Sequence, residues 1–179
     1  MTTGERSGQA RLRVRAAVDG SGRPSVATGV SVLDHLLSLL AEYAAFDLSL
    51  EVEPGSASAE VVAAGRALGE ALWDPLRVVG ARGHGSATIP ADEALAHVAL
   101  EASGRPLVVS NVDLSDVHLA GLGTDVVSAF LQELVAGAGL TVHVRLIEGA
   151  DPQHVLETIF KSLGVSLAQA CRPRRREGE

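Results

Sequence analysis

The feature that most limits the possible folds of this chain is an internal repeat. The segment 46–55 has the same order of apolar strand and glycine breaker as the segment 140–149. Each is followed by a helical pattern that contains a Leu-Gly pair, at residues 68–69 in the first copy and at 163–164 in the second. Such self-similarity indicates two related units that are built from the same elements.

Each unit is expected to run strand, strand, helix, strand, helix. Alternation across residues 11–18, followed by an Asp-Gly-Ser-Gly turn, predicts a hairpin in the first unit. In the second unit, strands at 95–100 and 107–112 flank a Ser-Gly-Arg-Pro turn and predict another. Helical spacing of apolar residues predicts helices at 32–43, 60–72 and 125–136. Because such helices need a sheet to cover, the predicted fold class is α+β, with helices packed on mixed or antiparallel sheets.

Breaker residues give the boundaries of the two units. A Trp-Asp-Pro segment at 73–75 closes the first repeat, so we assign 1–79 to the first half-domain and 80–171 to the second. The Gly-rich segment 80–85 is interpreted as a loop. The basic residues 172–179 are expected to form a mobile tail, as chain ends often do.

Composition excludes several classes of protein. The 179 residues carry a formal net charge of -7, which disfavours nucleic acid as the main partner. The single cysteine excludes an intrachain disulfide, and no segment has the pattern of a signal peptide or a membrane helix, so we expect a cytoplasmic location. No Walker loop, dinucleotide fingerprint or Gly-x-Ser-x-Gly elbow is present, which disfavours a nucleotide enzyme or serine hydrolase. Cys171 has no identified base, so a thiol nucleophile is also disfavoured.

Four residues are candidates for metal ligands. His154 and Glu157 are three apart at the start of the last predicted helix, so both side chains can converge on one cation. Two further imidazoles are His35, at the head of the first predicted helix, and His143, within an apolar strand. The alternatives are a solvated polar pair on a helix face and, for His143, a structural histidine in the core.

Two other pairs are candidates for chemistry. Asp92 and Glu93 precede a strand and could form a turn or act on a ligand, and we retain them as candidate catalytic residues. Arg105 and Lys161 are cations suited to a phosphate, although surface charges have the same appearance in a sequence.

Taken in order, these motifs resemble those of imidazoleglycerol-phosphate dehydratase, a lyase of histidine biosynthesis. The matching segments span nearly the whole chain: Thr28-Gly29, Asp34-His35-Leu36-Leu37, Phe46-Asp47-Leu48, Leu68-Gly69-Glu70-Ala71-Leu72, Pro90-x-Asp92-Glu93-Ala94-Leu95, Ser103-Gly104-Arg105-Pro106, Val142-His143 and His154-x-x-Glu157-x-x-Phe160-Lys161. The resemblance implies a duplicated ribosomal protein S5 domain 2-like fold and a homo-oligomer, in which trimers build a 24-subunit shell with shared active sites. It also implies two manganese ions and a phosphorylated imidazole as substrate.

Transferred residue by residue, the resemblance implies a degenerate metal centre. His35, His154 and Glu157 match three of the four ligands of one family site, and the fourth falls on Ala59. The other site keeps only His143, because its remaining ligands fall in the segments 58–62 and 153–154, where serine, alanine, valine and glutamine replace ligands. At most one manganese site is therefore expected.

The resemblance also implies changes around the substrate. The family's N-terminal glutamate aligns with Gln9, its phosphate-side glutamine with Leu39, and the arginine of an Arg-Phe-Gly segment with Gly83, where Arg82 could partly compensate. Arg105 and Lys161 persist. Three functions stay open: a lyase with weak or altered dehydratase activity, a non-catalytic paralogue that forms a shell or binds a phosphorylated ligand, and a protein with changed substrate chemistry in a specialised pathway.

Overall fold

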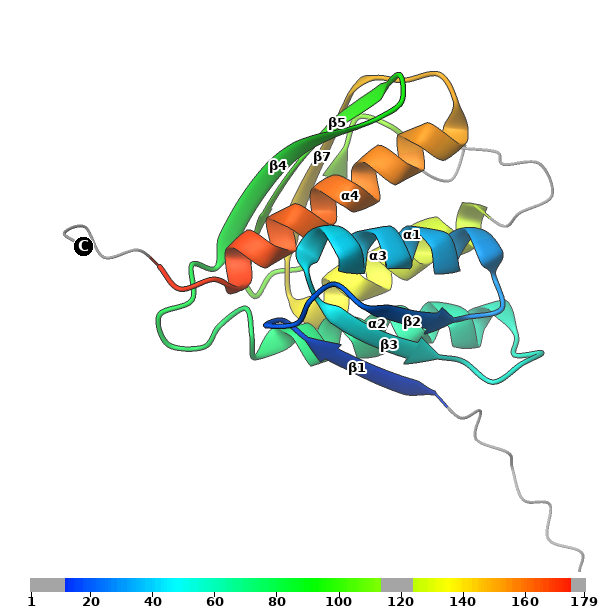
Figure 1. The fold of residues 1–179 in the computed structure, drawn as a ribbon, viewed down its shortest axis with the longest axis horizontal. Helices are drawn as coiled ribbons and strands as arrows, with labels where there is room; N and C mark the ends of the chain where they lie inside the picture. Colours follow the sequence, from blue (N-terminus) through cyan, green and yellow to red (C-terminus); the bar gives the residue numbers. More distant parts are fainter. Residues whose placement is uncertain (1–11, 114–123, 175–179) are drawn as a thin grey trace, which may run out of the picture.

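A computed structural model describes residues 12–113 and 124–174, in which four helices lie between two β-sheets (Figure 1). The first sheet contains β1 (Arg13–Ala17), β2 (Pro24–Ala27) and β3 (Asp47–Glu51); the second contains β4 (His84–Ala91), β5 (Ala94–Glu101), β6 (Leu107–Ser110) and β7 (Thr141–Glu148). The helices are α1 (Ser31–Ala44), α2 (Ser58–Trp73), α3 (Thr124–Ala138) and α4 (Pro152–Cys171). Both sheets are mixed, which confirms the predicted α+β class.

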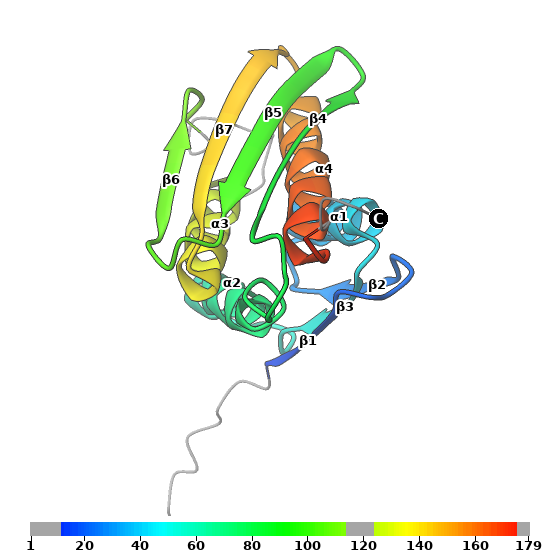
Figure 2. The ribbon, with the colours of Figure 1, turned by 90° about the vertical axis from the view of Figure 1, so that its left-hand side faces the viewer.

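The strand order corrects the two predicted hairpins. The first sheet has the order β1-β3-β2 and the second the order β4-β5-β7-β6, so β3 and β7 separate the strands expected to pair (Figure 2). Burial favours these positions: Leu48 and Leu50 make β3 the most buried strand of the first sheet. In the second sheet the two central strands are β5, which is the more buried, and β7, in which Val142 and Val144 are buried. A helix links β3 and β7 each to its parallel neighbour.

The strand β4 corrects the interpretation of the segment 80–85 as a loop, because the last two residues of that segment belong to the strand. His84 instead begins a strand of eight residues, which pairs with β5 along its whole length. The segment 172–174 of the predicted tail forms backbone hydrogen bonds with the segment 80–82, and residues 175–179 lie outside the described part of the chain. Arg82 N donates to Arg172 O at 2.8 Å, and Arg174 N donates to Gly80 O at 2.7 Å. Within the described residues, no helix is both long and apolar enough to span a membrane.

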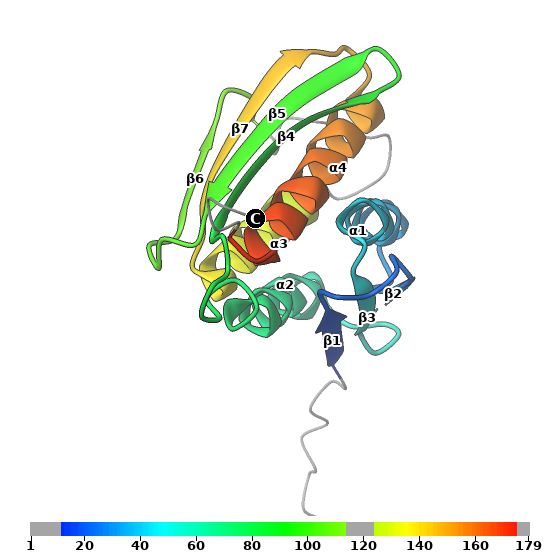
Figure 3. The same ribbon diagram turned by 60° about the vertical axis from the view of Figure 1, so that its left-hand side comes forward.

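The helices pair across the two halves. α2 packs on α3, and α4 packs on α1, while each sheet is covered by the helices of its own half (Figure 3). Both contacts depend on a glycine of the repeated Leu-Gly pair: a Cβ on Gly69 would meet the carbonyl of Leu134, and a Cβ on Gly164 would meet that of Leu40. Leu40 and Leu134 are related by the same offset as Phe46 and Leu140, so the repeat extends to the helix contacts.

Buried hydroxyl groups fix α4 over the hairpin of β4 and β5. Thr158, Ser162 and Ser166 lie one helical turn apart and are fully buried. Thr158 accepts from Ala96 N at 3.0 Å, Ser162 donates to Ala96 O at 3.1 Å, and Ser166 donates to Val98 O at 3.0 Å. Ser162 also accepts from Ile89 N at 3.1 Å. The start of α4 is thereby held next to the turn that joins β4 to β5.

Replacing Gly69 with alanine tests the contact between α2 and α3. Helix propensity alone would make Gly69→Ala stabilising by about 1 kcal/mol. The added Cβ would lie 2.6 Å from Ala138 N, so overpacking should reverse the sign and destabilise the protein by about 1–3 kcal/mol. Chemical denaturation measures the difference. The exposed neighbour Glu70→Ala is the control and should change stability by less than about 0.5 kcal/mol; a stabilised Gly69→Ala variant would contradict the close contact.

Candidate active site

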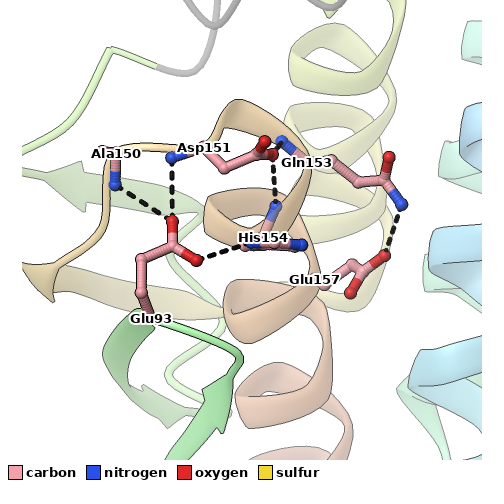
Figure 4. Close-up of polar contacts among 6 residues, drawn as sticks. All are labelled: Glu93, Ala150, Asp151, Gln153, His154 and Glu157. Carbon is pink, nitrogen blue, oxygen red and sulfur yellow. Dashed lines mark hydrogen bonds and ion pairs between the residues drawn. The ribbon is translucent and has the colours of Figure 1, made fainter.

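The candidate site lies at one end of the second sheet, where the turn between β4 and β5 meets the start of α4 (Figure 4). Asp92 and Glu93 form this two-residue turn, and Asp92 has a φ of 52°, the left-handed region that few residues other than glycine adopt. Asp151 caps α4 by accepting hydrogen bonds from Gln153 N at 2.8 Å and His154 N at 3.3 Å. The cap places His154 in the first turn of the helix.

Glu93 is bonded through both of its carboxylate oxygens. Oε1 accepts from Asp151 N at 2.9 Å and from Ala150 N at 3.3 Å, and Oε2 lies 2.6 Å from His154 Nδ1. The hydrogen bond from Asp151 N, followed by that from His154, lowers the pKa of Glu93 to about 2. The same contact with Glu93 raises the pKa of His154. At neutral pH Glu93 is therefore an ionised acceptor, and the proton between the two side chains is on Nδ1.

Glu157 has a separate set of partners. Its Oε1 lies 2.9 Å from His35 Nε2 on α1 and accepts from Gln153 Nε2 at 2.9 Å. Partial burial opposes ionisation of Glu157, but the bonds from Gln153 and His35 outweigh it and lower the pKa of the carboxyl. The predicted pair of His154 and Glu157 is thus present on one helix, with each side chain bonded to a different element of the fold.

The position of His35 depends on the start of α1. Its neighbour Asp34 accepts from both the backbone N and the hydroxyl of Thr28, at 2.8 Å and 2.5 Å. These bonds fix the loop before α1 and explain why Thr-Gly and Asp-His occur together in the sequence. The side chain of His35 is 51% exposed, compared with 15% for Glu157, so the imidazole is open to solvent and to ligands.

Two overlapping sets of side chains carry groups that bind divalent cations. Imidazole nitrogens and carboxylate oxygens from His35, His154 and Glu157 are typical ligands of first-row divalent metals. Among the described residues, the one group whose ligand atoms all lie within 4.8 Å of one another is Asp92, Glu93 and His154, so the set of His35, His154 and Glu157 is not such a group.

The start of α2, where the resemblance would require more ligands, offers few. Ser58 and Ala59 are exposed and lack an imidazole or carboxylate, and Val62 packs against the core. Glu60 is already used, because its carboxylate accepts from Ala57 N at 2.9 Å and caps the helix. Ser58, Ala59 and Val62 therefore offer no imidazole or carboxylate, and the carboxylate of Glu60 is held at the helix cap.

His143 and Arg105 lie away from this group within one chain. His143 is on the exposed face of β7, since its neighbours Val142 and Val144 are buried. Arg105 is in the turn before β6, next to Thr141 at the far end of the sheet from Glu93. Strands of eight residues separate the two ends by about 23 Å. Lys161 is closer: it lies on α4 one turn beyond Glu157, with its Nζ 5.5 Å from the ring centre of Tyr43.

A basic hollow that sequence reasoning missed lies near the Arg105 end of the sheet. It has a volume of about 520 Å³ and is lined by Arg82, His84, Gln169, Arg172, Pro173 and Arg174. The pairing of the segment 172–174 with 80–82 brings these cations together, and the basic run at the chain end was its one signal in the sequence.

Cys171 precedes this segment. Burial raises the pKa of its thiol to about 11, so the thiol stays protonated at neutral pH.

Fold and site together define a two-sheet α+β protein with an exposed carboxylate and imidazole site at one sheet end. The family model of imidazoleglycerol-phosphate dehydratase matches residues 28–167, a range that includes all eight candidate site residues. The imidazoleglycerol-phosphate dehydratase of Acetivibrio thermocellus is 33% identical over 174 residues, which cover 93% of this chain and 88% of the relative. That of Lactococcus lactis subsp. cremoris is 39% identical over 164 residues, or 86% and 80% of the two chains.

Solved structures with a similar fold belong to the same family as these relatives. The Staphylococcus aureus imidazoleglycerol-phosphate dehydratase superposes with a TM-score of 0.79 at 30% identity, covering 92% of this chain and 95% of that one. The Pyrococcus furiosus enzyme, in complex with (S)-C348, also gives 0.79, at 25% identity and with 97% and 95% covered. The chain belongs to the imidazoleglycerol-phosphate dehydratase family. The resemblance and the predicted duplicated S5 domain 2-like fold are thereby confirmed.

The contact between Glu93 and His154 should make stability depend on pH in a defined window. Glu93 has a folded pKa of about 2 against an ordinary 4.5, so its contribution is present above pH 4.5 and is lost as the pH falls towards 2. His154 has a raised pKa, so its contribution is present below 6.5 and is lost as the pH rises through the raised value. The difference in unfolding free energy between the native protein and Glu93→Gln should therefore be largest between pH 4.5 and 6.5.

Denaturant titrations across this pH range, with a chelator present, measure the difference. Asp92→Asn is the matched control, because it removes a neighbouring carboxylate for which no direct hydrogen bond to His154 is found in the described structure. A Glu93→Gln difference that stays constant with pH would contradict the ion pair.

Proposed function

We propose that this protein is a carbon-oxygen lyase related to imidazoleglycerol-phosphate dehydratase, with weak or altered dehydratase activity and a reduced metal centre. Family membership supports the reaction class and a phosphorylated imidazole as the substrate. The observation that carries the reduced centre is the start of α2, where Ser58, Ala59 and Val62 stand in place of metal ligands. Histidine biosynthesis in the cytoplasm is the corresponding cellular role.

One manganese ion would be held by His35, His154 and Glu157. When bound, such a cation supplies a positive charge that stabilises negative charge developing on an imidazole ring. The residues of the chain have their own roles beside it. Gln153 would orient the carboxylate of Glu157, to which it donates, and Lys161, one turn further along α4, would attract the substrate phosphate.

The site as a whole requires a second copy of the chain. Along the strands of one chain, Arg105 lies about 23 Å from the Glu93 end of the sheet, and His143, which pairs with Ala99, lies roughly 17 Å from it. A small substrate cannot cross either gap. Both residues are on the surface of the described structure, where a neighbouring subunit can present them. We therefore propose a homo-oligomer built from trimers, up to a 24-mer, with sites shared between subunits.

A second candidate function is a non-catalytic paralogue that forms a shell or binds a phosphorylated ligand. It is favoured by the loss of ligands at Ala59, Val62 and Gln153 together, because a protein without turnover has no need for a complete metal centre. The cations Arg105 and Lys161 would then serve binding alone. The two candidates differ in whether metal binding leads to dehydration.

Metal content and activity separate the candidates. After incubation with Mn²⁺ and gel filtration, the native protein should retain at most one ion per chain, because one set of three ligands persists. Elemental analysis measures the metal, and an assay with imidazoleglycerol phosphate in added Mn²⁺ measures turnover. Two ions per chain with rapid turnover would contradict the reduced centre. An intact assembly without metal or turnover would rule out the lyase and leave the second candidate.

A second experiment restores metal ligands at the start of α2. The double substitution Ala59→His with Val62→Glu places an imidazole and a carboxylate three residues apart on α2 and should raise the affinity for Mn²⁺. Ala63→His is the matched control, since Ala63 is exposed on the same helix and corresponds to no family ligand. Equal gains in the two variants would show that added donors act non-specifically.

Shared sites predict complementation between two defective variants. Arg105→Ala and His154→Ala should each bind imidazoleglycerol phosphate weakly, because each lacks a residue of every site. After the two are mixed and reassembled in equal amounts, about a quarter of the sites should contain both native residues. Calorimetric titration measures the fraction of sites that bind with native affinity. No recovery in assembled mixtures would mean that the two residues do not contribute to a common site.

A further inference from the structure

The structure assigns Glu93 a positioning role: it holds the His154 imidazole as the Nδ1–H tautomer, so that Nε2 keeps a free lone pair for a cation or substrate. This inference rests on the proposed function, because it concerns the same site. It removes Glu93 from the catalytic residues that the sequence suggested and makes it a residue that acts through His154.

The hydrogen bonds of Glu93 exclude the other neutral tautomer of His154, in which Nε2 carries the proton. Oε1 is occupied by the backbone N–H groups of Asp151 and Ala150, which can only donate. Oε2 is therefore the oxygen that faces His154, at 2.6 Å from Nδ1, and as a carboxylate it can only accept. The remaining ring nitrogen, Nε2, has no partner within the described chain. In Figure 4 the ring lies between Glu93 and the Glu157 carboxylate on the same helix.

Direct chelation by Asp92, Glu93 and His154 is the competing interpretation of this cluster. Their ligand atoms are close enough for a cation, but both oxygens of Glu93 already accept hydrogen bonds. A cation between Glu93 and His154 would have to replace the proton on Nδ1 and break a contact of 2.6 Å. A carboxylate that accepts from the non-ligating nitrogen of a histidine is instead the usual way in which proteins orient a metal-binding imidazole.

Replacement of Glu93 by glutamine tests this assignment, because it should change which nitrogen of His154 carries the proton. The amide oxygen of the new side chain must stay with the N–H groups of Asp151 and Ala150, because the amide nitrogen cannot accept from them. The amide nitrogen then faces His154 and donates to Nδ1, which moves the imidazole proton to Nε2. Glu93→Gln should therefore invert the tautomer of His154 with almost no change in shape.

Long-range ¹H–¹⁵N spectra of the metal-free protein, labelled on histidine and recorded at a pH where the imidazoles are neutral, report the tautomer directly. His154→Gln assigns the signal. The native protein should show Nδ1–H and Glu93→Gln should show Nε2–H. Asp92→Asn, which removes the adjacent charge and leaves the Glu93 bond in place, should keep the native tautomer. An Nε2–H tautomer in the native protein would overturn the proposal.

Calorimetry with Mn²⁺ as the probe measures the consequence. Loss of the free lone pair in Glu93→Gln should weaken Mn²⁺ binding by about 10–100-fold, the usual effect of removing such a supporting carboxylate. Unchanged affinity with an inverted tautomer would overturn the link between Glu93 and the cation. A native protein that shows Nδ1–H but binds no Mn²⁺ would overturn that link and the proposed metal centre together, whereas the spectra test the role of Glu93 whether or not the lyase is active.

Discussion

The packing of α4 on the hairpin of β4 and β5 is the contact on which the candidate site depends. Three hydroxyl side chains one turn apart bond to the backbone of the two strands, in a part of the protein without solvent. An apolar helix face could slide or rotate on a sheet at little cost, but buried hydroxyl groups require their partners. The helix is thus fixed in both rotation and translation. As a result, the first turn of α4 always meets the same two-residue turn, and His154 meets Glu93.

Much of the fold could be predicted from the sequence, because the elements follow from local patterns. Helical periodicity gave α1, α2 and α3 to within two residues at each end, and the repeat indicated that the halves share their elements. Strand partners could not be predicted in the same way. Alternation shows that residues 11–18 form a strand but not which strand lies beside it, and a short turn favoured the wrong neighbour twice. Insertion of β3 and β7 between the expected partners depends on burial in the assembled sheet.

The candidate site shows the same limit. His35, His154 and Glu157 could be chosen as candidate metal ligands from their residue types and spacing. The structure brings all three to the starts of α1 and α4. The role of Glu93 could not, because its bond to His154 joins residues 61 positions apart through the packing of a helix on a hairpin. The distance of Arg105 from this group was equally hidden, since a turn residue gives no indication of which sheet end it occupies.

The two carboxylates of the site differ in how firmly their hydrogen bonds hold them in place. Glu93 bonds backbone groups that cannot move without unfolding the start of α4, so its charge and position are part of the fold. Glu157 bonds only side chains, one of which is the half-exposed His35, and these can rotate away at modest cost. A divalent cation can therefore compete for Glu157 and His35 without disturbing the backbone, whereas competition for Glu93 would loosen the helix cap. This asymmetry supports the proposal that Glu157 is on the ligand side of the His154 imidazole and Glu93 on its supporting side.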